Sequence, residues 1–162
     1  MRLWHYKLIH ILPNAQLIGQ WRECCAVAQM WANEHDIRHP LVRPVLNYGP
    51  EELFLYCKLV KEEMESRGFK IQEYTVVKLK DNMYKIFSEF NKDSNYIRSV
   101  IDDIWDCYFE TDTFIQNHRL FDKWHNNTYF DICYWNLYEK YLCECIPEDE
   151  WIRFIEGGRE LV

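Results

Sequence analysis

The sequence predicts an all-α protein folded as one compact bundle of about five to seven helices. The chain has 162 residues, the ordinary size of one domain. Hydrophobic residues make up 48% of the chain, whereas only 5 Gly and 5 Pro are present to interrupt helices. Apolar residues recur at helical spacing along most of the sequence, and the β-like run near Thr75 lacks a partner strand. We therefore expect a single domain over residues 1–162.

The first predicted helix begins after Pro13, with Asn14 as a suitable N-cap. Its apolar residues follow the spacing of one buried helical face: Leu17, Ile18, Trp21, Cys24, Cys25, Ala28 and Trp31. Residues 35–50, HDIRHPLVRPVLNYGP, contain three Pro and one Gly, which predicts an extended loop. The clearest helix then begins at Pro50, with acidic residues in its first turn, and ends at Gly68.

The second half of the chain contains further helical patterns, separated by short polar breaks. They cover about residues 76–90, 95–109, 112–124, 128–145 and 147–156. Five aromatic residues fall at helical spacing in this half, and we expect them in the core rather than stacked on nucleic-acid bases: Trp105, Tyr108, Phe114, Phe121 and Trp124.

Charge and composition restrict the classes of function. The formal net charge of −7 argues against an extended nucleic-acid surface, so any DNA site must be local. The first third of the chain is the candidate region, because it contains several cations among few acids: Arg2, Lys7, Arg22, Arg38 and Arg43. No apolar run is long enough to span a bilayer, so we expect no membrane association.

The cysteines indicate a reducing compartment. There are seven, an odd number, and Cys24 is adjacent to Cys25, which suits buried thiols better than a disulfide framework. The chain also begins without a basic segment followed by an apolar one, so we expect a cytoplasmic protein. A metal site at His35 and His39 is disfavoured because Pro40 interrupts any helix through the pair. We expect no metal and no cofactor.

The stretch QWRECCAVAQMW, residues 20–31, places an arginine and a glutamate together in an apolar helix. Successive helical residues project about 100° apart, so either Arg22 or Glu23 lies near the apolar face. One interpretation is a boundary pair, in which Glu23 bonds a loop donor or Arg38. The other is a partly desolvated carboxylate that serves as an acid or base at a functional site.

The segment MRLWHYKLIHILPNAQLIGQWRECCA resembles the start of the pyrimidine-dimer DNA glycosylase family, which includes phage endonuclease V and small bacterial proteins beginning with MRLW. The similarity continues through IRHPLVRPVL and PEELFLYCKLVKEEMESRGF, and a weaker similarity is found in HNNTYFDICYWNLYEK. It covers about residues 1–70, whereas residues 75–120 carry almost none of it. Residues 75–162 are therefore expected to form a divergent helical part of the same domain.

This resemblance implies an endonuclease V-like fold with a strand-like N-terminal segment and activity as a DNA glycosylase and AP lyase on pyrimidine dimers or related base damage. The nucleophile would be the α-amine of Met1, which attacks the sugar C1′ and forms a Schiff base. An α-amine with a pKa of about 8 is far more often neutral near pH 7.5 than a lysine with a pKa of about 10.4. Glu23 would stabilise the developing sugar cation and assist proton removal at C2′.

The same resemblance implies a DNA-binding role for Arg22, whose guanidinium suits a backbone phosphate. Arg2 and His39 would also contact DNA, and His125 is a further candidate, which would face the same cleft. The partner would be damaged duplex DNA, bound by a monomer. Two alternatives stay open: a non-catalytic member of this fold that binds DNA or a protein, and hydrolysis or damage-independent lyase chemistry on another substrate class.

Overall fold

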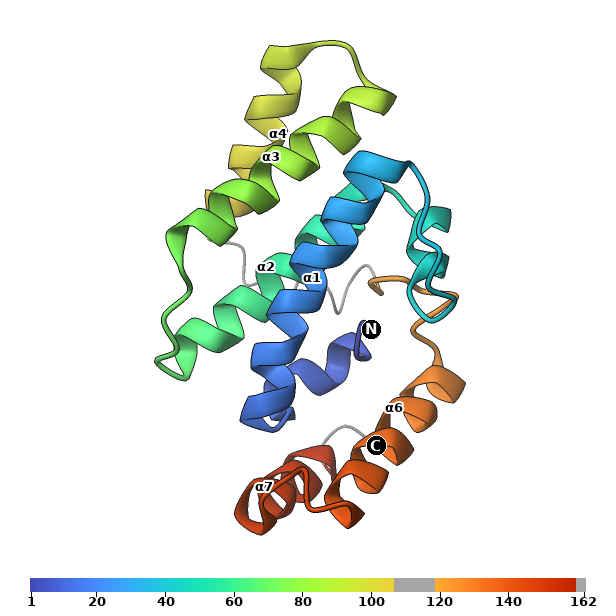
Figure 1. The fold of residues 1–162 in the computed structure, drawn as a ribbon, viewed down its shortest axis with the longest axis vertical. Coiled ribbons are helices and arrows are strands. Elements are labelled where there is room, and N and C mark those ends of the chain that lie inside the picture. The colour runs from blue at the N-terminus through green and yellow to red at the C-terminus, as the bar shows by residue number, and fades with distance from the viewer. Residues whose placement is uncertain (107–118, 160–162) are drawn as a thin grey trace.

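The computed structural model of the protein describes residues 1–106 and 119–159. Within these ranges the chain is helical and contains no strand, which confirms the all-α class (Figure 1). Two short 3-10 helices, η1 (Tyr6–Ile11) and η2 (Arg43–Asn47), precede and follow the first long helix. The α-helices are α1 (Asn14–Glu34), α2 (Pro50–Ser66), α3 (Glu73–Phe90), α4 (Ser94–Asp106), α6 (Asn127–Leu142) and α7 (Glu148–Arg159).

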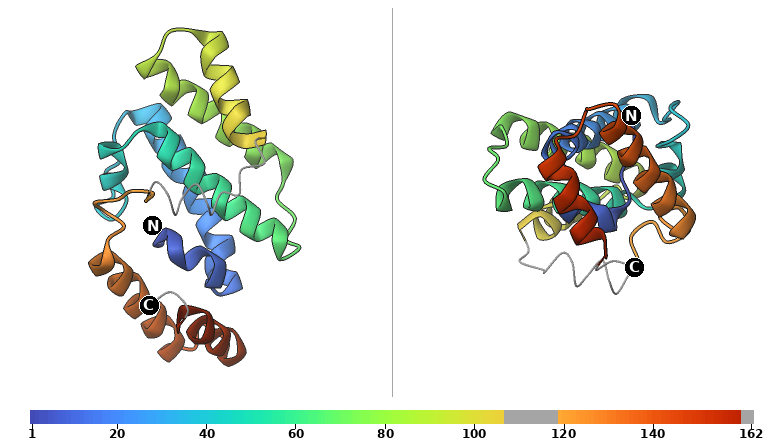
Figure 2. Two further views of the ribbon diagram at one scale, coloured as in Figure 1. Left: turned by 180° about the vertical axis from the view of Figure 1, so that it is seen from behind. Right: turned by 90° about the horizontal axis from the view of Figure 1, so that it is seen from below.

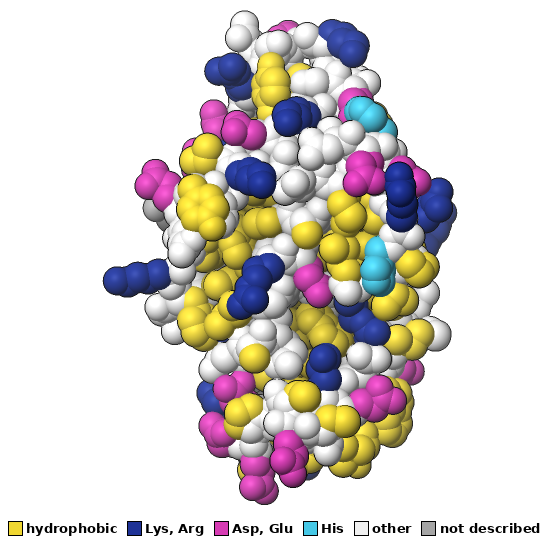
Figure 3. Space-filling view, viewed as in Figure 1, with side chains coloured by type: hydrophobic (Ala, Val, Ile, Leu, Met, Phe, Trp, Pro, Cys, Tyr) yellow, Lys and Arg dark blue, Asp and Glu magenta, His cyan; other side chains and the backbone are white. Residues whose placement is uncertain are grey.

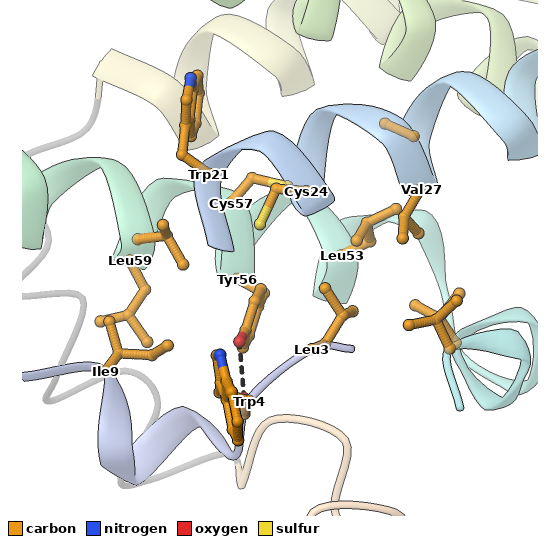
Figure 4. Packing of buried hydrophobic residues seen from close by; sticks show 14 of the residues in the cluster. Leu3, Trp4, Ile9, Trp21, Cys24, Val27, Leu53, Tyr56, Cys57 and Leu59 are labelled. Atoms are coloured by element: carbon orange, nitrogen blue, oxygen red, sulfur yellow. Dashed lines mark hydrogen bonds between the residues drawn. The ribbon is translucent and has the colours of Figure 1, made fainter. Parts of the chain in front are cut away.

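Helices α1 and α2 lie side by side at the centre of the molecule. The hairpin of α3 and α4 covers one end and the pair α6 and α7 the other, with the N-terminal segment between them (Figures 1 and 2). Cys24 of α1 faces Cys57 of α2 in the core, and both side chains are fully buried (Figure 4). Tyr56 is equally buried and points toward the N-terminal segment, so α2 supports that segment (Figure 4).

The start of α1 differs from the prediction by one residue. Pro13 occupies the N-cap position and makes no side-chain cap, so Asn14 is the first helical residue. The backbone N–H of Asn14 donates to Glu150 Oε2 at 2.6 Å, and its side-chain amide donates to Oε1 at 3.2 Å. A carboxylate from α7 therefore caps α1, where the helix dipole favours negative charge.

The N-terminal segment and residues 35–50 also differ from expectation. No strand forms near the N-terminus, because residues 1–5 have no regular structure and Tyr6–Ile11 is the 3-10 helix η1. The predicted extended loop contains a turn and η2, which begins at Arg43 next to Pro44, a residue whose fixed φ suits the first turn of a helix.

The predicted helix over residues 112–124 is wrong where it can be tested. Residues 119–124 are in turns, and Arg119 and Phe121 have φ values of 43° and 53°, which a right-handed helix does not allow. The Phe121 N–H donates to Glu52 at 2.7 Å, and the Trp124 N–H donates to the Tyr48 hydroxyl at 2.9 Å. The Trp124 and His125 N–H groups also bond the Phe121 carbonyl, so one turn of backbone hydrogen bonds is held in place by tertiary contacts. Residues 112–118, together with Tyr108 and Phe114, lie outside the described ranges.

Three further expectations concern the core aromatics, the cysteines and the membrane. Phe121 is fully buried, and Trp105 and Trp124 are partly buried against the core, as predicted. The cysteines that the structure describes are all free thiols, although Cys143 and Cys145 are exposed rather than buried. No helix in the described part of the chain is long and apolar enough to cross a membrane.

Arg67, just after α2, holds η1 against the rest of the fold. Its Nε donates to Glu63 at 2.6 Å, and Nη1 donates to the Leu12 carbonyl at 2.6 Å and to Asn14 Oδ1 at 3.1 Å. Its Nη2 donates to the His10 carbonyl at 2.8 Å. The planar guanidinium thus satisfies carbonyl groups at the end of η1 that have no helical partner.

We expect Arg67→Lys to lower the free energy of unfolding by about 2–3 kcal/mol, because an ammonium cannot reach these acceptors together. Urea denaturation measures the change. Arg153→Lys is the matched control, since Arg153 lies on the surface and pairs only within its own helix with Asp149. A loss below about 0.5 kcal/mol for Arg67→Lys would contradict the assigned role.

Candidate functional site

Glu23 of α1 binds the beginning of the chain. Its Oε2 accepts a hydrogen bond from the backbone N–H of Arg2 at 2.7 Å, and its Oε1 lies 3.8 Å from the α-amine nitrogen of Met1. The Glu23 side chain remains 31% exposed. One carboxylate therefore holds a backbone donor and an amine while staying open to solvent, which is an arrangement able to accept or return a proton.

Side chains from several elements hold the backbone that follows Arg2. The Trp4 N–H donates to Gln20 of α1 at 2.9 Å, and the Trp4 carbonyl accepts from the Tyr56 hydroxyl of α2 at 2.6 Å (Figure 4). The Leu3 carbonyl accepts from the Tyr129 hydroxyl of α6 at 2.7 Å. In these bonds side chains satisfy backbone groups that a neighbouring strand would satisfy in a sheet. They determine where the Met1 amine lies.

His5 and His125 form a buried pair beside this segment. The His5 Nδ1 accepts from the Lys7 N–H, so its Nε2 carries the proton and donates to the His125 carbonyl at 2.8 Å. The Tyr6 N–H donates to His125 Nδ1 at 3.1 Å, and the two imidazole rings stack with centroids 5.1 Å apart. Burial lowers the pKa of His5 from 6.5 to about 4, and burial also lowers the pKa of His125 well below its usual value.

The Arg2 side chain lies in the wall of the site rather than on an open surface. Its guanidinium carbon is 5.0 Å from the centre of the Trp4 ring. Burial raises the pKa of the nearby Cys133 thiol on α6, and the Arg2 charge opposes that rise. One guanidinium nitrogen, Nη1, is buried and has no hydrogen-bond partner. Buried donors are normally satisfied, so this nitrogen is a position where a bound ligand oxygen would be favourable.

The other predicted residues lie at different depths. Arg22 is exposed and makes no ion pair with any residue in the described ranges. His39 is partly exposed, and its Nδ1 accepts the Leu41 N–H at 3.3 Å rather than contacting Glu23. His125 is only 4% exposed, so it is not a surface histidine, and its Nδ1 accepts the N–H of Tyr6 at the start of η1.

The boundary-pair interpretation of Glu23 holds in one of its two forms: Glu23 bonds a donor outside the helices, the Arg2 N–H, and Arg38 is not its partner. Arg38 pairs with Glu34 at 3.6 Å, one turn away on the surface, whereas Glu23 binds the N-terminal backbone. His35 likewise pairs with Glu89 at 2.7 Å and not with His39. Across residues 1–106 and 119–159, no group of three or more potential ligands is arranged to hold a metal ion.

Sequence reasoning missed Gln20, Tyr56 and Tyr129, the side chains that position the N-terminal backbone. Gln20 carried a detectable signal, since a polar residue within an apolar helical face, here 1% exposed, needs a hydrogen-bond partner. The two tyrosines fit core positions as well as any aromatic residue. Their hydroxyls bond backbone carbonyls of residues 4 and 3, which are 52 and 126 residues away in the sequence, and no local pattern indicates such partners.

Comparison with known families gives a match over the part of the chain that contains Met1 and Glu23. Residues 1–75 match the model of the pyrimidine dimer DNA glycosylase family. The match confirms the resemblance seen in the sequence, and this family consists of DNA repair glycosylases. It spans the N-terminal segment, α1, η2 and α2, and it ends at the first turn of α3. No curated protein and no solved structure matches the chain.

We expect the buried histidine pair to make the fold sensitive to acid. Because the pKa of His5 is about 4 in the fold and 6.5 for an ordinary imidazole, the unfolded chain binds more protons between these values. The free energy of unfolding should therefore fall by about 2 kcal/mol from His5 as the pH drops from 7 to 5. His125 should add to this fall.

Urea denaturation at a series of pH values measures the effect in the wild type and in His5→Gln, whose amide keeps a donor for the His125 carbonyl. The variant should show a shallower dependence on pH between 7 and 5. An identical dependence in the two proteins would sink the assignment to His5.

Proposed function

We propose that the protein is a DNA glycosylase with AP-lyase activity on pyrimidine dimers or related base damage, and that the Met1 α-amine is its nucleophile. One observation supports this most strongly: the amine lies 3.8 Å from the carboxylate of Glu23, within the region that matches the family. A neutral amine attacks C1′ of the damaged nucleotide, and the bond from C1′ to the base breaks with its electron pair leaving on the base.

In this proposal Glu23 acts at two stages. Its negative charge first stabilises the positive charge that develops on the sugar as the base departs. The C1′–O4′ bond then breaks as the C1′–nitrogen double bond of the Schiff base forms, and O4′ takes up the proton that the amine has released. Glu23 next accepts a proton from C2′, and the electron pair of that C–H bond expels the 3′ phosphate. The hydrogen bond from the Arg2 N–H at 2.7 Å supports both roles, because it fixes one carboxylate oxygen and leaves the other toward the amine.

The DNA contacts follow from exposure and charge. Arg22 projects from the outer surface of α1 with no competing carboxylate in the described structure, which suits a backbone phosphate. His39, partly exposed on the loop before η2, is a second candidate contact. The unpaired Nη1 of Arg2 would be satisfied by an oxygen of the bound nucleotide beside the amine.

Borohydride trapping tests the nucleophile. We expect incubation with ultraviolet-irradiated duplex DNA and borohydride to give a covalent adduct on the intact protein, because borohydride reduces the Schiff base to a stable amine. Mass spectrometry of the digested adduct should place it on the first peptide. Undamaged duplex is the control substrate. An adduct on a lysine side chain, with the α-amine free, would contradict the role of Met1.

The absence of any adduct, with duplex binding intact, would instead favour the non-catalytic DNA-binding alternative. The net charge of −7, which argues against an extended nucleic-acid surface, is the observation that keeps open a non-catalytic member that binds a protein.

Glu23→Gln tests the carboxylate. The amide oxygen can still accept the Arg2 N–H, so the fold and DNA binding should persist, while strand cleavage falls by at least about 100-fold. Gel analysis of single-turnover cleavage measures the rate, and Glu34→Gln is the control with the same change of charge on the same helix. Cleavage by Glu23→Gln at the wild-type rate would remove Glu23 from the mechanism.

A further inference from the structure

Helix α3 runs parallel to α1 in a constant register. The Trp21 indole N–H donates to the Thr75 hydroxyl at 3.2 Å, and His35 bonds Glu89 at 2.7 Å, so both pairs join residues 54 apart in the sequence. A residue of α1 therefore lies opposite the residue numbered 54 higher in α3. By this register Lys78 lies opposite Cys24, within about 3 Å of the level of Arg22 along the helix axes.

The charge of Lys78 acts on the same part of α1. Burial raises the pKa of the Cys25 thiol to about 12, and the Lys78 ammonium opposes that rise. Cys25 projects about 60° from Arg22 around α1, on the side away from Glu23. Around the outer surface of α1, Arg22 therefore lies between Glu23 on one side and Cys25 on the other. Lys78 is on the Cys25 side.

Both cations at this surface are available to a ligand. Arg22 and Lys78 are exposed, and neither forms an ion pair within the described ranges. The acidic residues nearest to Lys78 along α3, Glu73 and Asp81, do not pair with it. Figure 3 shows Lys and Arg side chains spread over the face that carries α1 and α3, whereas a group of acidic side chains lies at the end that carries α7.

Helices α1 and α3 in contact have axes about 8–10 Å apart, so a side chain on each can reach neighbouring phosphates of one nucleic-acid strand. We propose that Lys78 binds a DNA backbone phosphate next to the one contacted by Arg22, so that α3 forms the second wall of the DNA-binding surface. The strand crosses α1 from Glu23 over Arg22 to Lys78. This inference rests on the proposed function and adds a contact from beyond residue 75, where the family match ends.

Salt dependence of binding tests the proposal, because each phosphate contact releases about one counterion. Fluorescence anisotropy with irradiated duplex gives the dissociation constant at several salt concentrations. Lys78→Gln should lower the slope of log affinity against log salt by about one and weaken binding about 5–10-fold near 0.1 M salt. Lys78→Arg, which keeps the positive charge, should restore both values.

Lys92→Gln is the matched control, since Lys92 is an exposed lysine just beyond the far end of α3. An unchanged slope in Lys78→Gln, or an equal loss in Lys92→Gln, would overturn the proposal. If the wild-type protein forms the borohydride-trapped adduct and Lys78→Gln binds DNA as tightly as wild type, this contact alone is refuted. A wild-type protein that binds but does not trap, with a slope that depends on Lys78, would refute the lyase function alone. No duplex binding by the wild type would refute both.

Discussion

The structure depends on satisfying the backbone of an N-terminal segment that is neither helix nor strand. The N–H groups of Arg2, Trp4 and Tyr6 need acceptors, and buried backbone donors without partners are costly. Glu23, Gln20 and His125 supply these acceptors, and two tyrosine hydroxyls satisfy the carbonyls of residues 3 and 4. The partners come from α1, α2, α6 and the turn before α6, so one short segment joins the central helices to the C-terminal half.

The position of the Met1 amine follows from this network. Glu23 and Gln20 are nearly one turn apart on α1, so their side chains hold alternate residues of the extended segment at a fixed height along the helix. α1 is fixed in turn by the Glu150 cap, and Arg67 fixes the end of η1. An amine at a chain terminus would ordinarily be mobile. Here the backbone contacts on residues 2–6 restrain it next to the carboxylate.

Local patterns in the sequence predicted the helices well, and predicted their partners poorly. The apolar spacing after Pro13 and the acidic first turn after Pro50 indicated α1 and α2, because those signals lie within each helix. The cap of α1 was misplaced because its acceptor, Glu150, comes from α7. The turn at residues 119–124 was missed because Glu52 and Tyr48 hold it from a distance. The pairing of Met1 with Glu23 came from the family resemblance, since no spacing rule brings residue 1 to residue 23.

The overall acidity is compatible with a local DNA surface, because charges act over short distances in salt. At 0.1 M ionic strength exposed charges are largely screened beyond about 10 Å, so acids near α7 have little effect on a phosphate bound at α1. The cations of α2 also differ from Arg22 and Lys78 in whether they form ion pairs. On α2, Lys58 and Lys61 each meet a glutamate one turn later, which neutralises them locally. Arg22 and Lys78 lack such neighbours within ion-pair distance in the described structure. Placement of acids, rather than net charge, therefore decides where a polyanion can bind.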